Sequence, residues 1–418
     1  MILDGVRKNK RRVLIGPDAH AADAMARLLP AAYQALVVRE TRRMRRKSLH
    51  EDAAPATAGA ECPRSRPMKP PATAATAAPL AASAGEILAG PPRANLLNVL
   101  RAMMRPGRLG LRSLPRDVLI ARYAKPQSRY LPLMGTRVHY TDEGAAHADG
   151  TLLLIHGFGA SLHTWDGMLP QLARRWRVIR LDLPPFGITG PLRDAEGRPR
   201  TMALPLYRDF IDAFVDSLGL HRLSLIGNSL GGMIAWDYAA RHADRVDRLV
   251  LIDSAGFPMK LPIYLDLFNH LGVRLTSPWM LPEGILHAAT RDVYGDPARV
   301  SEPTLRRYAD FFYAEGARQA IGRMVPTFHF DDVDTSALAA VRAPTLVLWG
   351  QRDRWIPPAH AAEFARRVPG AVLRMYPALG HIPMEEDPVR VGADLCAFLD
   401  QGRAASRLAE TAIQETRP

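Results

Sequence analysis

Six short apolar runs, each bounded by Gly, Pro or Asp, most strongly constrain what this chain of 418 residues can fold into. Stretches with a helical period separate several of these runs. Near-continuous apolar strands that alternate with helices are typical of a mostly parallel sheet covered on both faces. We therefore expect a doubly wound α/β fold. The runs are Thr151–Ile155, Arg177–Leu181, Leu223–Ile226, Arg248–Ile252, Thr345–Trp349 and Val372–Tyr376, and helices are expected at Trp165–Ala173, Tyr207–Leu218, Ile234–Arg241 and Ala359–Val368.

An insertion interrupts this alternation. About 90 residues separate Ile252 from Thr345, far more than one crossover needs. Their periodicity predicts helices at Ile263–Leu271, Glu283–Val293 and Thr304–Val325. A helical cap inserted before the penultimate strand would cover the carboxyl end of the sheet, where open α/β folds bind ligands. We therefore expect a core made of residues 95–256 and 341–405, and a cap made of residues 257–340.

A G-x-S-x-G pattern lies at residues 227–231, directly between an apolar run and an alanine-rich stretch. Between a strand and a helix, this pattern holds its serine in a sharp turn with the hydroxyl above the carboxyl end of the sheet. Gly227 and Gly231 are steric requirements, because side chains there would collide with the neighbouring strand and helix. The pattern predicts Ser229 as a nucleophile, in an elbow that also contains Asn228 and Leu230.

An acid and a histidine follow later strands. A serine hydroxyl becomes an effective nucleophile when an imidazole takes its proton and a carboxylate fixes the tautomer of that imidazole. Asp353 and His381 each come soon after one of the last two apolar runs, and serine, aspartate, histidine is the chain order of hydrolases with this architecture. Asp253, at the end of an earlier run, is the alternative acid. The Gly-x-x-Asp…Pro context favours Asp353.

Two backbone amides are candidates for stabilising negative charge. Attack on an acyl carbonyl creates an oxyanion, which preorganised N–H donors stabilise. The amide of Leu230 directly follows the nucleophile. The turn at His156 and Gly157 lets the backbone bend around the site, so the amide of Phe158 is the second candidate. A metal at His156 is the competing interpretation, but no second ligand stands beside it at ligand spacing. We expect neither a metal nor another cofactor.

Five motifs can be compared with those of known families. They are His156-Gly157-Phe158-Gly159, Asp182-Leu183-Pro184-Pro185-Phe186-Gly187, Gly227-Asn228-Ser229-Leu230-Gly231-Gly232, Gly350-Gln351-Arg352-Asp353 and Gly380-His381. Through these motifs the chain, from about Tyr130 to Leu399, resembles the α/β-hydrolase superfamily. The resemblance implies a serine nucleophile, an Asp353–His381 relay and hydrolysis of an ester, thioester, amide or ketone.

Within this superfamily the chain is similar to capped esterases, haloalkane dehalogenases, epoxide hydrolases and hydrolases of aromatic ring-cleavage products. Dehalogenases and epoxide hydrolases place an aspartate at the elbow, so Ser229 argues against both activities. The expected reaction is cleavage of a carboxylic ester, or a related acyl bond, of a hydrophobic small molecule, because the cap region is apolar. Carbon–carbon bond hydrolysis, acyl transfer and a catalytically dead binding module are the alternatives.

Basic residues are concentrated near the N-terminus. The formal net charge is +13, and residues 1–50 hold 12 Lys/Arg and 4 Asp/Glu, a net of +8. The run Arg42–Lys47 is expected either to make weak peripheral contact with anionic membranes or to be a solvated helix end. No aromatic residue is interleaved with these charges, so we expect no nucleic-acid partner.

Two segments precede the expected core. Residues 1–48 resemble the C-terminal tail of a short-chain dehydrogenase/reductase, through Arg11–Ala19 and Leu28–Pro30. The glycine-rich dinucleotide loop and the Tyr-x-x-x-Lys pair of that family are absent, so the segment is interpreted as a basic α/β fusion remnant without redox function. Residues 49–94 are rich in Ala, Pro, Thr and Ser, a composition that predicts a disordered linker.

The composition is that of a soluble globular protein, with 47% hydrophobic and 23% charged residues. No apolar run is long enough to predict a transmembrane helix, and the first residues lack the pattern of a cleaved signal. Cys62 and Cys396 are expected to be free thiols in a reducing compartment. These observations together predict a cytoplasmic protein and leave its oligomeric state undetermined.

Overall fold

The structure, a computed structural model, describes residues 110–144, 148–328, 330 and 333–401. All of them belong to the second of two units into which the chain divides, residues 83–418. The predictions for residues 1–48, for the linker at 49–94 and for Cys62 lie outside the described residues.

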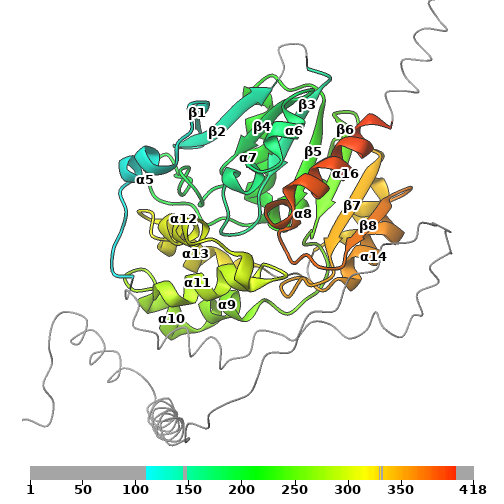
Figure 1. Ribbon diagram of the computed structural model, residues 1–418. Coiled ribbons are helices and arrows are strands. Elements are labelled where there is room, and N and C mark those ends of the chain that lie inside the picture. Colours follow the sequence, from blue (N-terminus) through cyan, green and yellow to red (C-terminus); the bar gives the residue numbers. More distant parts are fainter. Residues whose placement is uncertain (1–109, 145–147, 329, 331–332, 402–418) are drawn as a thin grey trace, which may run out of the picture. The chain divides into compact units, whose positions relative to one another are not determined.

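An eight-stranded sheet forms the centre of the described unit, in the order β1-β2-β4-β3-β5-β6-β7-β8 (Figure 1). β2 pairs antiparallel with both β1 and β4, and every other pairing is parallel. The predicted α/β fold with a mostly parallel sheet is therefore confirmed. The strands are β1 Ser128–Leu133, β2 Thr136–Gly144, β3 Thr151–Ile155, β4 Arg177–Leu181, β5 Leu223–Asn228, β6 Val246–Ile252, β7 Thr345–Gly350 and β8 Val372–Tyr376.

Helices bury both faces of this sheet. Successive residues of a strand point to opposite faces. In β3, Leu153 and Ile155 join a core shared with α7, α8 and α14, while Leu152 and Leu154 join one shared with α6 and α16. This double burial is why the inner parallel strands, such as β3, β5 and β7, are apolar without alternation. The helices outside the cap are α5 Arg116–Tyr123, α6 Leu169–Leu172, α7 Leu204–Ser217, α8 Leu230–Arg241, α14 Ala359–Arg367, α15 Pro383–Glu386 and α16 Pro388–Asp400.

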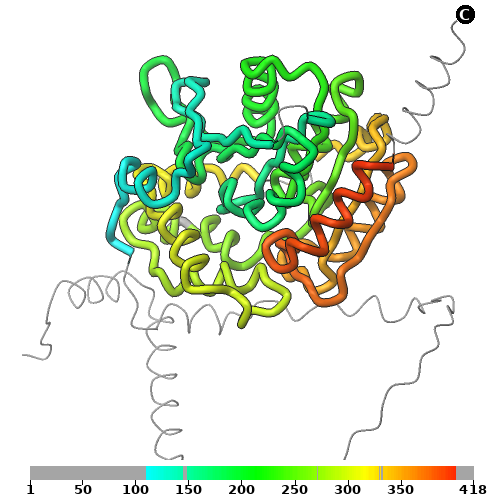
Figure 2. Tube along the Cα trace, turned by 45° about the horizontal axis from the view of Figure 1, so that its top comes forward, coloured from blue at the N-terminus to red at the C-terminus, as the bar shows by residue number. Residues whose placement is uncertain are grey.

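A helical cap lies between β6 and β7 in the sequence, as predicted. In Figure 2 this segment, in yellow-green, lies along one side of the core. Its α-helices are α9 Ile263–Asp266, α10 Leu271–Thr276, α11 Glu283–Asp292, α12 Glu302–Phe312 and α13 Ala317–Met324, and its 3₁₀ turns are Leu267–Asn269, Pro297–Arg299, Val325–Thr327 and Thr335–Ala340.

Three predicted helices are shorter than their periodicity indicated. The expected helix over residues 304–325 divides into α12 and α13 at Gly316, whose φ of 78° is a conformation that L side chains rarely adopt. The helix expected at 263–271 divides into α9, a 3₁₀ turn and the start of α10, and the one expected at 165–173 shrinks to α6. Periodicity identified the apolar faces of these segments, but it did not locate the turns of the backbone.

None of the helices in the described part of the chain is long and apolar enough to cross a membrane. Cys396, on α16, is a free cysteine, as expected.

Candidate active site

The turn between β5 and α8 holds Ser229 in a strained backbone conformation. Its φ of 54° and ψ of −117° are those of neither a helix nor a strand, and such strain is concentrated at functional sites. A Cβ atom added to Gly227 would lie 2.3 Å from the carbonyl oxygen of Gly231, and one added to Gly231 would lie 2.1 Å from that of Ile155. Glycine at both positions therefore lets the turn pack closely against α8 and β3.

Asn228 connects this turn to two other parts of the site. Its side-chain amide donates hydrogen bonds to the carbonyl oxygens of Ile252, at 3.0 Å, and His381, at 3.0 Å. The end of β6 and the loop after β8 are thus attached to the residue that precedes Ser229. The G-x-S-x-G pattern predicted that Asn228 lies in the elbow, but the spacing of the pattern did not predict these two hydrogen bonds.

His381 pairs with Asp353. The Nδ1 atom of His381 lies 2.8 Å from the Oδ2 atom of Asp353, and both residues are buried. The other oxygen of Asp353 accepts hydrogen bonds from the amides of Trp355 and Ile356, at 2.7 and 3.0 Å. Because a carboxylate can only accept, Nδ1 carries a proton and the Nε2 lone pair of a neutral His381 is available for another proton. Among the described residues, no hydrogen bond joins the hydroxyl of Ser229 to this ring.

Asp253, the alternative acid, lies at the end of β6 but does not bond to His381. Its Oδ1 atom accepts the amide of Gly350 at 2.9 Å. Its Oδ2 atom is buried, and the carboxyl group of Asp353 is close enough for a side-chain hydrogen bond with Asp253. Burial and the nearby charge of Asp353 raise the pKa of Asp253 well above its usual range. This shift favours the protonated form of Asp253.

The turn after β3 is held by His156, which is fully buried. Its Nε2 atom accepts the amide of Leu183 at 2.8 Å, so Nδ1 carries the proton and donates to the carbonyl of Gly157 at 2.7 Å. Burial lowers the pKa of His156, which favours this neutral form. Both ring nitrogens are occupied, so His156 positions the loop and is not free to bind a metal.

The two amides expected to bind an oxyanion belong to Phe158 and Leu230. The structure records no acceptor for either amide among the described residues, so both are available to a ligand. Gly157 allows the loop to approach the elbow, because a Cβ atom there would lie 3.0 Å from the Cβ atom of Ser229.

Glu386 fixes the loop that carries His381, a role that sequence analysis did not assign. Its two carboxyl oxygens accept the amides of Gly380, at 2.6 Å, and Gly295, at 2.8 Å. Burial raises the pKa of Glu386 to about 6, although these amides oppose the shift. The sequence feature that could have indicated this role is the acidic pair that follows His381, but such a pair is equally typical of a helix N-terminus.

A small apolar cavity of about 60 Å³ lies between the cap and the core. Its walls include the ring of Phe158, beside the candidate oxyanion donor, and the ring of Trp355, which stacks on His381 with centroids 5.8 Å apart. Phe268, Leu286 and Phe312 are among the apolar cap residues that also line it. A wider cavity of about 870 Å³ reaches Asp353 from the side of Met259 and Pro262.

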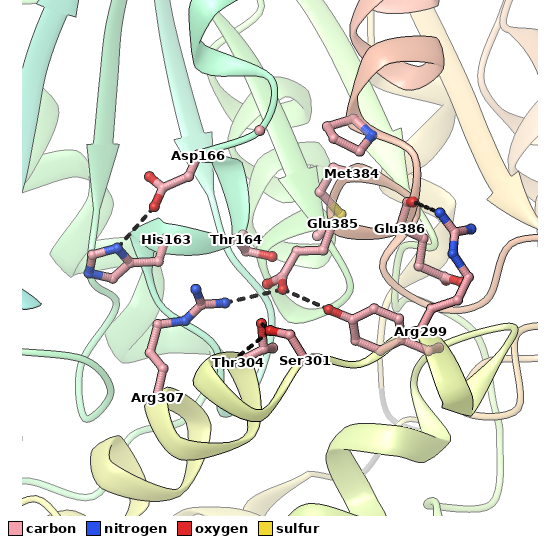
Figure 3. A pocket seen from close by; sticks show the side chains of 13 residues that line it. His163, Thr164, Asp166, Arg299, Ser301, Thr304, Arg307, Met384, Glu385 and Glu386 are labelled. Atoms are coloured by element: carbon pink, nitrogen blue, oxygen red, sulfur yellow. Dashed lines mark hydrogen bonds and ion pairs between the residues drawn. The ribbon is translucent and has the colours of Figure 1, made fainter.

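A separate polar cavity of about 290 Å³ lies where the cap meets α15 (Figure 3). Glu385 is its central anion, because it accepts hydrogen bonds from Tyr294 at 3.0 Å, Arg307 at 3.1 Å and Tyr308 at 2.8 Å. Arg299 donates to the carbonyl of Glu386 at 2.8 Å. These bonds connect the cap to the segment that directly follows His381.

Known proteins are similar to more than half of this chain. The 2-hydroxymuconate semialdehyde hydrolase of Pseudomonas sp. (strain CF600) is 31% identical over 280 residues, which are 65% of this chain and 93% of the relative. The dihydrolipoyllysine-residue acetyltransferase component of the acetoin cleaving system of Pseudomonas putida is 30% identical over 258 residues. That match covers 59% of this chain and only 63% of the relative.

Solved structures show the same fold. A bacterial membrane phospholipase A matches with a TM-score of 0.56 and 28% identity, over 66% of this chain and 86% of the other. A Bacillus subtilis carboxylesterase matches with a TM-score of 0.55 and 19% identity, over 73% of this chain and 99% of the other. The comparisons do not support the likeness of residues 1–48 to a short-chain dehydrogenase/reductase. The model of the alpha/beta hydrolase fold family matches residues 150–388, more than half of the chain, so the protein belongs to the α/β-hydrolase family.

Proposed function

We propose that this protein is a serine hydrolase that cleaves a carboxylic ester, or a related acyl bond, of a hydrophobic small molecule. Ser229 Oγ attacks the acyl carbonyl carbon, and its proton passes to Nε2 of His381. Asp353 holds Nδ1 of the ring and stabilises the imidazolium that forms. The amides of Phe158 and Leu230 bind the oxyanion. The proton then goes to the leaving alcohol, and water resolves the acyl-enzyme.

The observation that carries this proposal is the 2.8 Å bond between His381 and Asp353, in a loop that Asn228 attaches to the strained turn of Ser229. The missing bond between Ser229 and His381 is compatible with it, because such contacts are often long without substrate and shorten in the complex. The apolar cavity beside Phe158 and Trp355 supports a hydrophobic acyl group.

Hydrolysis of a carbon–carbon bond is the second candidate, supported by the 31% identity to the 2-hydroxymuconate semialdehyde hydrolase. Carbon–carbon bond hydrolysis and ester hydrolysis use the same fold but different electrophiles. Activity measured on a panel of ring-cleavage products and on a panel of esters therefore distinguishes the two reactions. Acyl transfer has some support from the acetyltransferase component that the chain matches. A rate that rises with added alcohol or thiol, with formation of the transferred ester, would identify it.

The first prediction concerns Ser229. Wild-type protein should hydrolyse p-nitrophenyl esters of short or medium chain and should be labelled by a fluorophosphonate. Ser229→Ala should lose both properties, since removal of a triad member typically lowers turnover by several orders of magnitude. Steady-state kinetics and gel-based labelling measure the two effects. A Ser229→Ala variant with wild-type turnover would show that another residue is the nucleophile.

We also propose that the basic N-terminal arm brings the protein to anionic lipid surfaces while the catalytic unit remains in the cytoplasm. The net charge of +8 in residues 1–50 supports this, as does the membrane phospholipase among the similar structures.

A further inference from the structure

The ring of Trp355 lies between the two cavities that adjoin the candidate site. It belongs to the lining of the small apolar cavity, together with Phe158, and to the lining of the wider cavity, together with Asp353. No other described residue lines both cavities. The residue is half-buried, and it packs against the hydrophobic clusters on both faces of the sheet and against a third cluster in the cap. Trp355 therefore forms part of the wall between the two cavities.

Helix α9 forms another part of this wall. Its residues Tyr264 and Leu265 line the small cavity, while Ile263 and Asp266 line the wider one. Because α9 separates the cavities with its backbone, an opening there would require the cap segment itself to move. At Trp355 the wall is a side chain, which can change its rotamer. The indole is therefore the part of the wall that can open while the backbone stays in place.

The indole is held closed by a hydrogen bond to the cap. Its Nε1 atom donates to Oδ2 of Asp292, at the end of α11, at 3.2 Å, and Oδ1 of the same carboxylate accepts Nε of Arg354 at 3.0 Å. The ring also stacks on His381, with an angle of 24° between the ring planes. The backbone amide of Trp355 donates separately to Asp353 at 2.7 Å. The indole can therefore turn away from Asp292 without breaking the bond between its own backbone and Asp353.

The small cavity by itself accommodates only a short acyl group. Its volume is about 60 Å³, whereas an apolar cavity of about 150 Å³ is needed to accept benzene. The wider cavity has a volume of about 870 Å³, and Met259, Leu261 and Pro262 give part of its lining an apolar character. Once the indole turns aside, a chain that starts beside Phe158 can continue along this apolar lining.

We propose that Trp355 is a gate that determines which acyl chains the enzyme accepts. When its indole turns away, the two cavities join into one binding site for the ester of a medium- or long-chain acyl group. This inference rests on the proposed serine hydrolase function and names its substrate class. Asp292 is a positioning residue, because it holds the indole from the cap and acts on the substrate only through Trp355.

The test measures kcat/KM for p-nitrophenyl butyrate and p-nitrophenyl octanoate. In Trp355→Ala the octanoate-to-butyrate ratio should rise by at least about 10-fold, because the longer chain no longer has to displace a ring. The gain should appear as a lower KM for octanoate with little change in its kcat, since the wall opposes binding in the ground state and the transition state alike. Trp355→Phe, which keeps a ring but has no N–H donor, should show a smaller gain in the same direction.

Asp292 tests the hydrogen bond that holds the gate. Asp292→Ala removes the acceptor of the indole N–H and should raise the ratio by about 3-fold, which corresponds to the loss of one hydrogen bond. Asp292→Asn removes the same charge beside Arg354 but keeps an oxygen that can accept the indole N–H. It should therefore keep the ratio of wild type, and an equal rise in both variants would contradict the role of this bond.

A role of Trp355 only in supporting His381 would lower kcat/KM for both esters by the same factor. An unchanged ratio in Trp355→Ala would therefore overturn the proposal. Trp279→Ala is the matched control, because Trp279 is an exposed tryptophan of the cap that lines neither cavity. It should leave the ratio unchanged. Met259→Trp, which fills the wider cavity, should cancel the octanoate gain of Trp355→Ala, and a gain that persists would show that the chain does not enter this cavity.

Two further measurements keep the outcome unambiguous. If circular dichroism shows that Trp355→Ala does not fold, the ratio in Trp355→Phe decides the test. Ser229→Ala should abolish hydrolysis of both esters in the Trp355→Ala background. Hydrolysis that survives Ser229→Ala would refute the serine mechanism itself, whereas hydrolysis that needs Ser229 but shows an unchanged ratio would refute only the gate.

Discussion

At the scale of single residues, Asp182 shows how one buried carboxylate organises loops beside the site. It follows β4 and accepts hydrogen bonds from the amides of Leu162 and Ile188, both at 2.8 Å, and from His139 at 2.7 Å. In Asp182→Asn, the side-chain NH₂ group would face the N–H groups that now donate to the carboxylate, so one donor would face another. We expect it to lower the free energy of unfolding by about 3 kcal/mol, measured by chemical denaturation. The control Asp247→Asn changes an exposed ion pair and should cost less than about 1 kcal/mol.

The same residue predicts a pH dependence. Burial alone would raise the pKa of Asp182, but the charge and hydrogen bond of His139 lower it to about 2. A folded-state pKa below the unfolded value contributes stability above about pH 4, and this is lost as the pH falls toward 2. The contribution is about 2 kcal/mol. The difference in unfolding free energy between wild type and Asp182→Asn should therefore narrow between pH 5 and pH 2. A constant difference would show that Asp182 is not ionised in the folded protein.

At the scale of elements, Glu385 joins α12 of the cap to α15 of the core. Arg307 and Tyr308, both on α12, donate to its carboxylate at 3.1 and 2.8 Å. Glu385→Gln would leave the largely buried Arg307 guanidinium without its counter-charge, and we expect a loss of about 3 kcal/mol of stability. We also expect a lower kcat, because Glu385 lies four residues after His381. Thermal unfolding and steady-state kinetics measure these effects.

The matched control is Tyr308→Phe, which removes one neutral donor from the same carboxylate. It should cost about 1 kcal/mol and leave Arg307 paired. Equal losses for the two variants would mean that charge compensation does not hold the cap to α15.

At the scale of the whole molecule, residues 1–92 contain none of the proposed catalytic residues. We predict that a protein starting at Arg93 keeps its kcat/KM for a soluble ester. It should bind liposomes with anionic lipid more weakly, because each basic residue near such a surface contributes about 1 kcal/mol. Vesicle sedimentation at low and high salt measures the change. An inactive or insoluble truncated protein would show that the arm is part of the fold, and undiminished binding would exclude it as an anchor.

Much of the fold could be predicted because a buried strand can be recognised from residues that are neighbours in the sequence. β3 and β4 have the predicted bounds, since a strand buried on both faces is a continuous apolar run between turn residues. β8 also has the predicted bounds, although it is an edge strand whose first three residues are exposed. The candidate residues Ser229, Asp353 and His381 could be proposed because each follows a strand. The prediction of a single helix over residues 304–325 was wrong, because the apolar periodicity continues across Gly316 although the backbone turns there.

The sequence by itself determined the alternation of strands and helices, the inserted cap and the order of the chemical groups along the chain. Only the tertiary structure decided that His381 pairs with Asp353, while Asp253 accepts the amide of Gly350 instead. It also decided that Asn228 connects the elbow to the His381 loop and that Glu386 holds that loop. The physical reason is that burial and hydrophobic period are properties of neighbouring residues, whereas hydrogen-bond partners depend on which strand ends the sheet order brings together.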